Sequence, residues 1–148
     1  YFAIGLPNAR GGWELRNKYF KTSTSPKTIS HLKNGQSKLI ITEGMFDLMS
    51  LCEIQPQILK SRDLLVLNSL AFTSRIEQII TQYQAVDLYM DNDQGGRFAS
   101  ENLMANHRNC SAHNNAYKDY TDVNEWLMNE SPIGIEHELK HEFQDVSL

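Results

Sequence analysis

The stretch that decides the fold is Met90-Asp91-Asn92-Asp93-Gln94-Gly95-Gly96, which directly follows the apolar run Val86-Asp87-Leu88-Tyr89. Such a run predicts a buried strand that ends near the first aspartate. Side chains two residues apart on a strand point the same way, so Asp91 and Asp93 should face one point beyond the strand's end. Two like charges held that close repel unless a cation lies between them, and Mg²⁺ or Mn²⁺ prefers such oxygen ligands. Taken alone, the stretch is more simply an Asp/Asn/Gly turn.

A second acidic residue follows another short apolar run. Residues 39–42 are Leu-Ile-Ile-Thr, the pattern of a buried strand, and Glu43 and Gly44 come directly after them. Residues 45–51 are then apolar at helical spacing, so Glu43 stands where a strand ends and a helix begins. In open α/β sheets, sites form outside the carboxyl ends of the strands. We therefore expect Glu43 to converge with the two aspartates, although 48 residues separate it from the first of them.

Strand and helix patterns alternate along most of the chain, which predicts an α/β fold with a parallel four-stranded sheet flanked by helices. The expected strands cover 38–42, 64–68, 86–90 and 116–118, and the expected helices cover 46–54, 74–83 (with Ser74 as N-cap), 96–107 and 122–128. Residues 1–5 and 12–18 are predicted to pair as a small β-hairpin, and 30–35 to form a connector. The expected organisation is a basic hairpin segment at 1–35, the α/β domain at 36–130, and a C-terminal helix (135–143) with a tail at 131–148.

The net charge of −4 conceals a strong asymmetry along the chain. Residues 1–40 hold seven cations and one acid, a balance of +6, which leaves −10 for the remainder. Five aromatic residues interleave with these cations, and together they suit a polyanion whose bases stack while its phosphates meet Lys and Arg. The other interpretation is a hairpin whose aromatic residues pack inward and whose lysines are solvated. The aromatic residues are Tyr1, Phe2, Trp13, Tyr19 and Phe20.

Composition excludes several classes of protein. A length of 148 residues with 41% apolar content suits one globular domain, and no apolar run approaches the roughly 20 residues of a membrane span. Cys52 and Cys110 fit neither a disulfide scaffold nor a zinc site. His137 and His141 stand at i, i+4, where a solvated helix face is the simpler interpretation than a zinc pair. The missing export signal and the free cysteines predict a cytoplasmic location, and the opening Tyr1 predicts a piece of a longer protein.

The two acidic stretches together resemble the signature motifs of the Toprim domain. Residues 41–47, Ile-Thr-Glu-Gly-Met-Phe-Asp, resemble the first motif with Phe46 one place late, and residues 90–96 resemble the second. Bacterial primases, type IA and II topoisomerases, and several nucleases and recombination proteins share this Rossmann-like domain. The best match is to bacterial and phage-type primases. Further similarity to them lies in 11–18, 25–27 and 67–71, and the resemblance covers roughly residues 3–128.

A third acidic cluster, Lys118-Asp119-Tyr120-Thr121-Asp122-Val123-Asn124-Glu125, resembles the motif that follows the last Toprim strand in primase-like proteins. Asp122 and Asn124 belong to its matching core, and Asp119 is a weaker candidate. Asp122 also stands at capping-box spacing from Glu125, so a helix cap is the preferred interpretation. Both roles are compatible, because a capping carboxylate at a strand end also faces the site.

The resemblance implies roles for individual residues. Asp91 and Asp93 would hold Mg²⁺ or Mn²⁺, and Glu43 would be a ligand or act on the attacking 3′-hydroxyl or water. Asp47 would shape the site or hold a second metal indirectly. Three glycines would let the backbone approach phosphate, and five cations would contact nucleic acid, although Arg97 is equally a surface residue. The glycines are Gly44, Gly95 and Gly96, and the cations are Arg16, Lys18, Lys21, Lys27 and Arg97.

The function implied is metal-dependent synthesis of RNA primers from ribonucleoside triphosphates on single-stranded DNA, with a helicase or other replication proteins as possible partners and no membrane. A Toprim nuclease and a non-catalytic DNA-binding module are the alternatives. Primases of this type carry a zinc-binding domain and a helical extension, and neither is evident in this sequence. Whether this segment alone is active is therefore left open.

Overall fold

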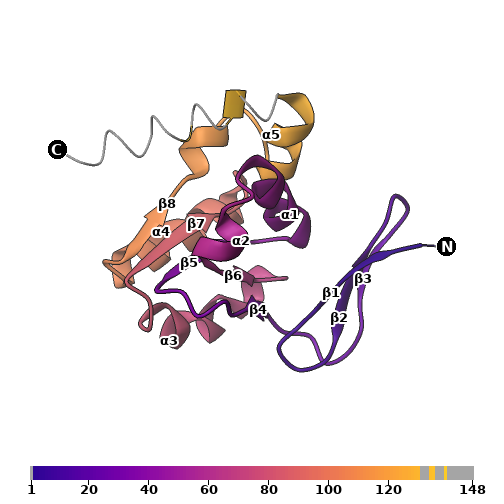
Figure 1. Ribbon diagram of the computed structural model, residues 1–148, viewed down its shortest axis with the longest axis horizontal. Coiled ribbons are helices and arrows are strands. Elements are labelled where there is room, and N and C mark those ends of the chain that lie inside the picture. Colours follow the sequence, from indigo (N-terminus) through magenta and orange to yellow (C-terminus); the bar gives the residue numbers. More distant parts are fainter. Residues whose placement is uncertain (1, 131–133, 136–138, 140–148) are drawn as a thin grey trace.

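The computed structural model describes residues 2–130, 134, 135 and 139, and it contains two separate β-sheets (Figure 1). The smaller sheet is antiparallel, with strand order β1-β2-β3. Its strands are β1 (Ile4–Pro7), β2 (Trp13–Arg16) and β3 (Lys21–Ser23). The expected hairpin is therefore present and is extended by β3, a strand of three residues that is too short for a periodic signal.

The larger sheet has five strands in the order β4-β6-β5-β7-β8. Four of them run parallel, as predicted, and β4 pairs antiparallel with β6 at one edge. The parallel strands are apolar on both sides, so the sheet requires helices on both faces. The strands are β4 (Ser30–Leu32), β5 (Lys38–Thr42), β6 (Asp63–Val66), β7 (Ala85–Tyr89) and β8 (Cys110–Ala112).

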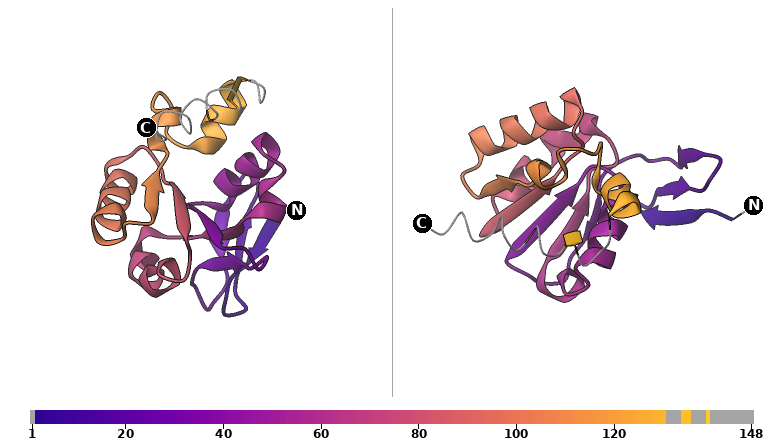
Figure 2. Two further views of the ribbon diagram at one scale, coloured as in Figure 1. Left: turned by 60° about the vertical axis from the view of Figure 1, so that its left-hand side comes forward. Right: turned by 90° about the horizontal axis from the view of Figure 1, so that it is seen from above.

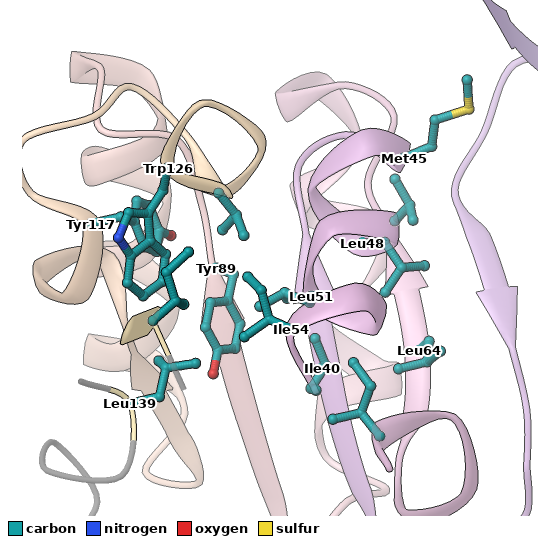
Figure 3. Close-up of a cluster of buried hydrophobic side chains, with 14 residues drawn as sticks. Ile40, Met45, Leu48, Leu51, Ile54, Leu64, Tyr89, Tyr117, Trp126 and Leu139 are labelled. Carbon is teal, nitrogen blue, oxygen red and sulfur yellow. The ribbon is translucent and has the colours of Figure 1, made fainter. Parts of the chain in front are cut away.

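Helices cover the two faces of the large sheet (Figure 2). On one face, α1 and α5 bury a cluster that includes Ile40 and Leu64 of the sheet (Figure 3). On the other face, α3 and α4 cover Leu39 and Leu88. The helical segments are α1 (Met45–Ile54), α2 (Ile58–Ser61), α3 (Glu77–Ile80), α4 (Gln94–Asn106) and α5 (Val123–Asn129), with 3₁₀ segments η1 (Leu70–Arg75) and η2 (Asn114–Tyr117).

The last parallel strand lies earlier in the chain than expected. Strand β8 covers Cys110–Ala112, and 116–118 falls in and after η2 instead. Because Ala112 pairs with Leu88, residues 116–118 already lie beyond the carboxyl edge of the sheet. There Tyr117 is buried, and its hydroxyl donates to the Met90 carbonyl over 2.7 Å. The large ring that suggested a strand residue is therefore buried in a turn.

Three further expectations differ in detail. The helix expected at 74–83 is replaced by η1 and the single-turn α3, and Ser69 rather than Ser74 caps this region by accepting from the Ala71 amide. The connector expected at 30–35 contains β4, whose Ser30 is buried beside β6. The helix expected at 135–143 lies mostly outside the described residues, as do His137 and His141. No helix in the described part of the chain is long and apolar enough to cross a membrane.

The strand order reverses its direction at one point of the large sheet, between β5 and β7. Strand β5 is central, β6 lies on one side of it, and the chain then crosses to β7 on the other side. Ligand sites in such folds lie outside the carboxyl ends of the strands at this switch point. Thr42 pairs with Tyr89 across it, so the residues that follow each strand emerge side by side.

Substitution of the glycines in the turn after β7 tests how tightly this turn is packed. A Cβ atom at Gly96 would clash with the carbonyl oxygen of Asp91, whereas one at Gly95 would meet the flexible end of Leu70 at 2.8 Å. We predict that Gly96→Ala lowers the free energy of unfolding by about 1–3 kcal/mol, since backbone must move. Gly95→Ala should change it by less, because the gain in helix propensity offsets a side-chain shift. Urea unfolding followed by circular dichroism measures both, and equal losses would contradict this packing.

Candidate acidic metal site

Three carboxylates from three different elements meet beyond the switch point. Asp47 lies in the first turn of α1, Asp91 follows β7, and Asp122 is the N-cap of α5. One carboxylate oxygen from each lies within 4.8 Å of the others. The geometry thus brings together Asp91, predicted as a ligand, and Asp47, predicted to shape the site or hold a second metal indirectly. It adds Asp122, for which the sequence favoured the role of a cap. That cap is also present, since Asp122 Oδ1 accepts from the Glu125 amide over 2.7 Å.

Glu43 and Asp93 lie around this group of three. Glu43 Oε2 accepts from the Asp91 backbone amide over 3.4 Å, as expected from the adjacency of β5 and β7. Asp93 is exposed and caps α4, because its Oδ1 accepts from the Gly96 amide over 2.7 Å. Its charge still reaches the site, where it raises the pKa of both Glu43 and Asp91. That Glu43 and Asp93 themselves ligate a metal stays a prediction.

Burial and mutual repulsion make the ionised forms of these acids costly. Burial, followed by the charges of Glu43, Asp47 and Asp122, raises the pKa of Asp91 to about 8. Burial and then Asp122 raise the pKa of Asp47 to about 6. Asp91 Oδ1 is buried and has no hydrogen-bond partner among the described residues. An unpaired carboxylate oxygen beside two further carboxylates is a donor set that fits a hard divalent cation.

Asn124 fixes the most buried of the three acids. Its backbone amide donates to Asp47 Oδ1 over 3.2 Å, and its side-chain amide donates to Ser50 Oγ over 3.0 Å. Ser50 in turn donates to the Phe46 carbonyl within α1. The first turn of α5 is thereby tied to the first two turns of α1, so Asn124 belongs to the site as a residue that holds Asp47 in place.

The predicted glycines serve the packing of the site in different ways. Gly44 is the N-cap of α1, and a Cβ atom there would lie 3.0 Å from Asp47 Oδ2. Gly96 has no room for a side chain because the Asp91 carbonyl fills the space, whereas Gly95 faces Leu70. The requirement for glycine at position 96 thus has a structural cause within the chain itself.

Two asparagines near the site lie in stretches that resemble the Toprim domain of primases, but their structural roles were not predicted. Asn92 donates its side-chain amide to three backbone carbonyls in 114–120, and only its central place in the acidic motif marked it. Asn68 follows β6 with a positive φ of 64°, a conformation that Asn tolerates better than most residues. Its backbone amide donates to the Glu43 carbonyl over 3.0 Å, which anchors the loop after β5.

Cations of the small sheet border the acidic site. Arg16 and Lys21 line a cavity together with Gly44 and Asn68, and the charge of Lys21 lowers the pKa of Glu43, opposing the larger effect of burial. Arg16 also lies over the ring of Phe46, 4.8 Å from its centroid. The small sheet therefore contacts α1 at the rim of the site.

A second groove continues from this rim. Arg16 and Lys18 line it with Phe2, Phe46 and Asn124, so aromatic and cationic side chains share one surface. The two remaining predicted cations do not line this groove. Lys27 is exposed, and burial raises the pKa of Glu14, a residue of the first cavity, while the charges of Lys21 and Lys27 lower it, so Lys27 lies near that cavity. Arg97 is exposed in the first turn of α4, where it lines a separate groove with Asn92 and Phe98.

Solved structures of primases share this architecture. The primase fragment of the bacteriophage T7 primase-helicase protein matches with a TM-score of 0.70 at 21% identity, covering 94% of this chain and 61% of that one. A complex of the bacteriophage T7 lagging-strand DNA polymerase with primase domains of two gp4 subunits, an RNA/DNA hybrid and dTTP matches with a TM-score of 0.69 at 21% identity, covering 94% of this chain and 74% of that one. The zinc-binding and RNA polymerase domains of the Aquifex aeolicus primase match with a TM-score of 0.55 at 15% identity, covering 94% and 39%. At these identities the likeness shows a shared fold.

Family models assign the chain more directly. Residues 1–25 match a domain of unknown function, DUF8464. A search of curated proteins found no match. Residues 40–127, more than half of the chain, match the Toprim-like model, and this span contains every acid of the site described above. The chain therefore belongs to the Toprim-like family, with the fold of the primase members of that family.

Proposed function

We propose that this chain is the metal-dependent catalytic domain of a primase-like protein, which joins ribonucleotides into short primers on single-stranded DNA. The observation that carries the proposal is the convergence of Asp47, Asp91 and Asp122, with an unpaired buried oxygen on Asp91, in a fold shared with solved primases. The chain spans 61% of the length of the T7 primase fragment. The activity of a whole primase is therefore proposed for the parent protein rather than shown by this likeness.

The acids suit this chemistry in distinct ways. Asp91, Asp47 and Asp122 would hold Mg²⁺ or Mn²⁺, which when bound neutralises charge on a triphosphate and its departing pyrophosphate. Glu43 lies beside them, and its raised pKa makes its carboxylate a better acceptor for the proton of an attacking 3′-hydroxyl. Burial of Asp47 and the hydrogen bond from Asn124 would keep the ligand geometry constant during the reaction.

The small sheet supplies a path for a nucleic-acid strand. Phe2, Phe46 and the cations Arg16 and Lys18 line one groove, and Lys21 lies close enough to Glu43 to alter its pKa. Aromatic side chains stack bases and cations follow phosphates, which is how single strands bind without sequence preference. The related T7 primase domains were solved in a complex with a DNA polymerase, an RNA/DNA hybrid and dTTP, and this groove would accommodate a strand of such a hybrid.

Removal of one acid tests the metal site. We predict that Asp91→Asn weakens Mn²⁺ binding by at least about tenfold in calorimetry, because it removes a central carboxylate ligand. Asp119→Asn, a change at an exposed acid on the segment before α5, should bind as the unmodified chain does. Equal affinities in all three proteins would refute the assignment.

The acids of this site should make the stability of the folded chain depend on pH. Because the pKa of Asp91 is raised to about 8, the folded chain holds a proton there that the unfolded chain has lost. Stability without metal should therefore fall as pH rises from 5 to 8, and Mn²⁺ should restore it. Thermal unfolding at several pH values measures this, and Asp91→Asn should flatten the profile.

Charge removal tests the nucleic-acid path. Lys18→Ala/Lys21→Ala/Lys27→Ala should lower the slope of log K against log salt for single-stranded DNA by about 2, since about 0.7 is lost per phosphate contact. Lys33→Ala/Lys38→Ala/Lys60→Ala removes the same charge near the amino ends of the strands and is the matched control. An equal reduction in both triple variants would mean that only net charge matters.

Activity separates primase from nuclease. In the parent protein, or in this domain joined to its natural neighbours, we expect incorporation of labelled ribonucleotides on a single-stranded template with Mn²⁺ or Mg²⁺. Asp91→Ala should abolish it without unfolding the domain, because removing one of several clustered charges relieves repulsion. Cleavage of plasmid or oligonucleotide that Asp91→Ala abolishes, with no incorporation, would assign a nuclease. DNA binding with neither activity would assign a non-catalytic module.

A further inference from the structure

Asn92 joins two parts of the chain that the acids would otherwise drive apart. Its side-chain amide faces the carbonyls of Asn114, Tyr117 and Tyr120 at 3.2, 2.8 and 3.0 Å. Its backbone amide donates to the Thr121 carbonyl over 2.6 Å. One residue therefore uses both of its amide groups to bind the segment between β8 and α5.

The hydrogen bond between Asn92 and Thr121 joins two residues that are each next to an acid of the metal site. Asn92 directly follows Asp91, and Thr121 directly precedes Asp122. One oxygen of each of those two carboxylates lies within 4.8 Å of the other, and two negative charges at this separation repel. We propose that Asn92 is a positioning residue, which sets the separation of Asp91 and Asp122 and thereby the affinity for a divalent cation. The inference rests on the metal site of the proposed function.

Other hydrogen bonds hold the beginning of this segment without Asn92. Asn114 donates to the Met90 carbonyl over 2.9 Å, and the Tyr117 hydroxyl donates to the same carbonyl over 2.7 Å. The carbonyls of Tyr120 and Thr121, which precede Asp122, accept from the side chain and the backbone amide of Asn92 respectively, while the Thr121 amide donates to Glu125 Oε2 within α5. Loss of the Asn92 side chain removes the bonds to Tyr117 and Tyr120 but keeps the backbone bond to Thr121. We therefore expect the segment that leads to Asp122 to loosen while β8 and η2 keep their anchors.

Asn92→Ala tests this role by Mn²⁺ calorimetry on the full chain. We expect the dissociation constant to rise roughly tenfold, the usual effect of removing a group that orients metal ligands. Asn109→Ala is the matched control, because Asn109 likewise donates its side-chain amide to two backbone carbonyls, of Ile80 at the end of α3 and of Tyr83, near the amino end of β7. Both variants should lose thermal stability, but the control should keep its Mn²⁺ affinity.

A double-mutant cycle separates positioning from general loosening. Asp122→Asn keeps a good helix cap but removes the carboxylate, so Asn92→Ala should add little to it if Asn92 acts through Asp122. Additive losses would overturn the inference. If Asn92→Ala does not fold, Asn92→Ser, which keeps one side-chain donor, decides in the same cycle.

The outcomes also distinguish this inference from the metal site itself. Mn²⁺ binding that depends on Asp91 but is unchanged in Asn92→Ala and Asn92→Ser overturns the role of Asn92 alone. A chain that binds no Mn²⁺ overturns the metal site and this inference together.

Discussion

Negative charge gathered at one edge of a parallel sheet is the constraint to which the surrounding structure responds. Asp47, Asp91 and Asp122 come from segments that meet only because β5 and β7 are neighbours and α1 and α5 share a face. Left to electrostatics alone, these segments would separate. Neutral amides and backbone carbonyls hold them instead, and these add no charge to the site.

The two sheets present opposite charges at the site. The large sheet presents carboxylates, which repel phosphate unless a cation is bound, and the small sheet presents Arg16, Lys18 and Lys21 at the rim. Contact between them is made by Arg16 over Phe46 and by Leu6 packed against the core of the α1 face. The basic segment is thus part of one surface with the acids, so the charge asymmetry along a chain of net charge −4 becomes a charge asymmetry across this surface.

The parallel core was predictable because it depends on patterns that are local and strong. Runs such as 39–42 and 86–90 are apolar enough to reveal buried strands, and an acid after each pointed to the switch point. Strands β3, β4 and β8 have three residues each, too few for periodicity to show, so the edge strand and the position of the last parallel strand were missed. The participation of Asp122 in the acidic group and the role of Asn92 depend on long-range hydrogen bonds. Such bonds leave no periodic trace, and only the family resemblance suggested that Asp122 faces the site.

The spacing of the three acids along the chain has a consequence for biosynthesis. Asp47 and Asp91 can come together once β7 has docked beside β5, but the third carboxylate is at position 122, near the end of the Toprim-like match. A polypeptide still emerging from the ribosome therefore displays an incomplete ligand set until nearly the whole domain has been translated. Binding of an ion at the proposed site would in this sense report completed folding, since only a finished domain would offer all three carboxylates.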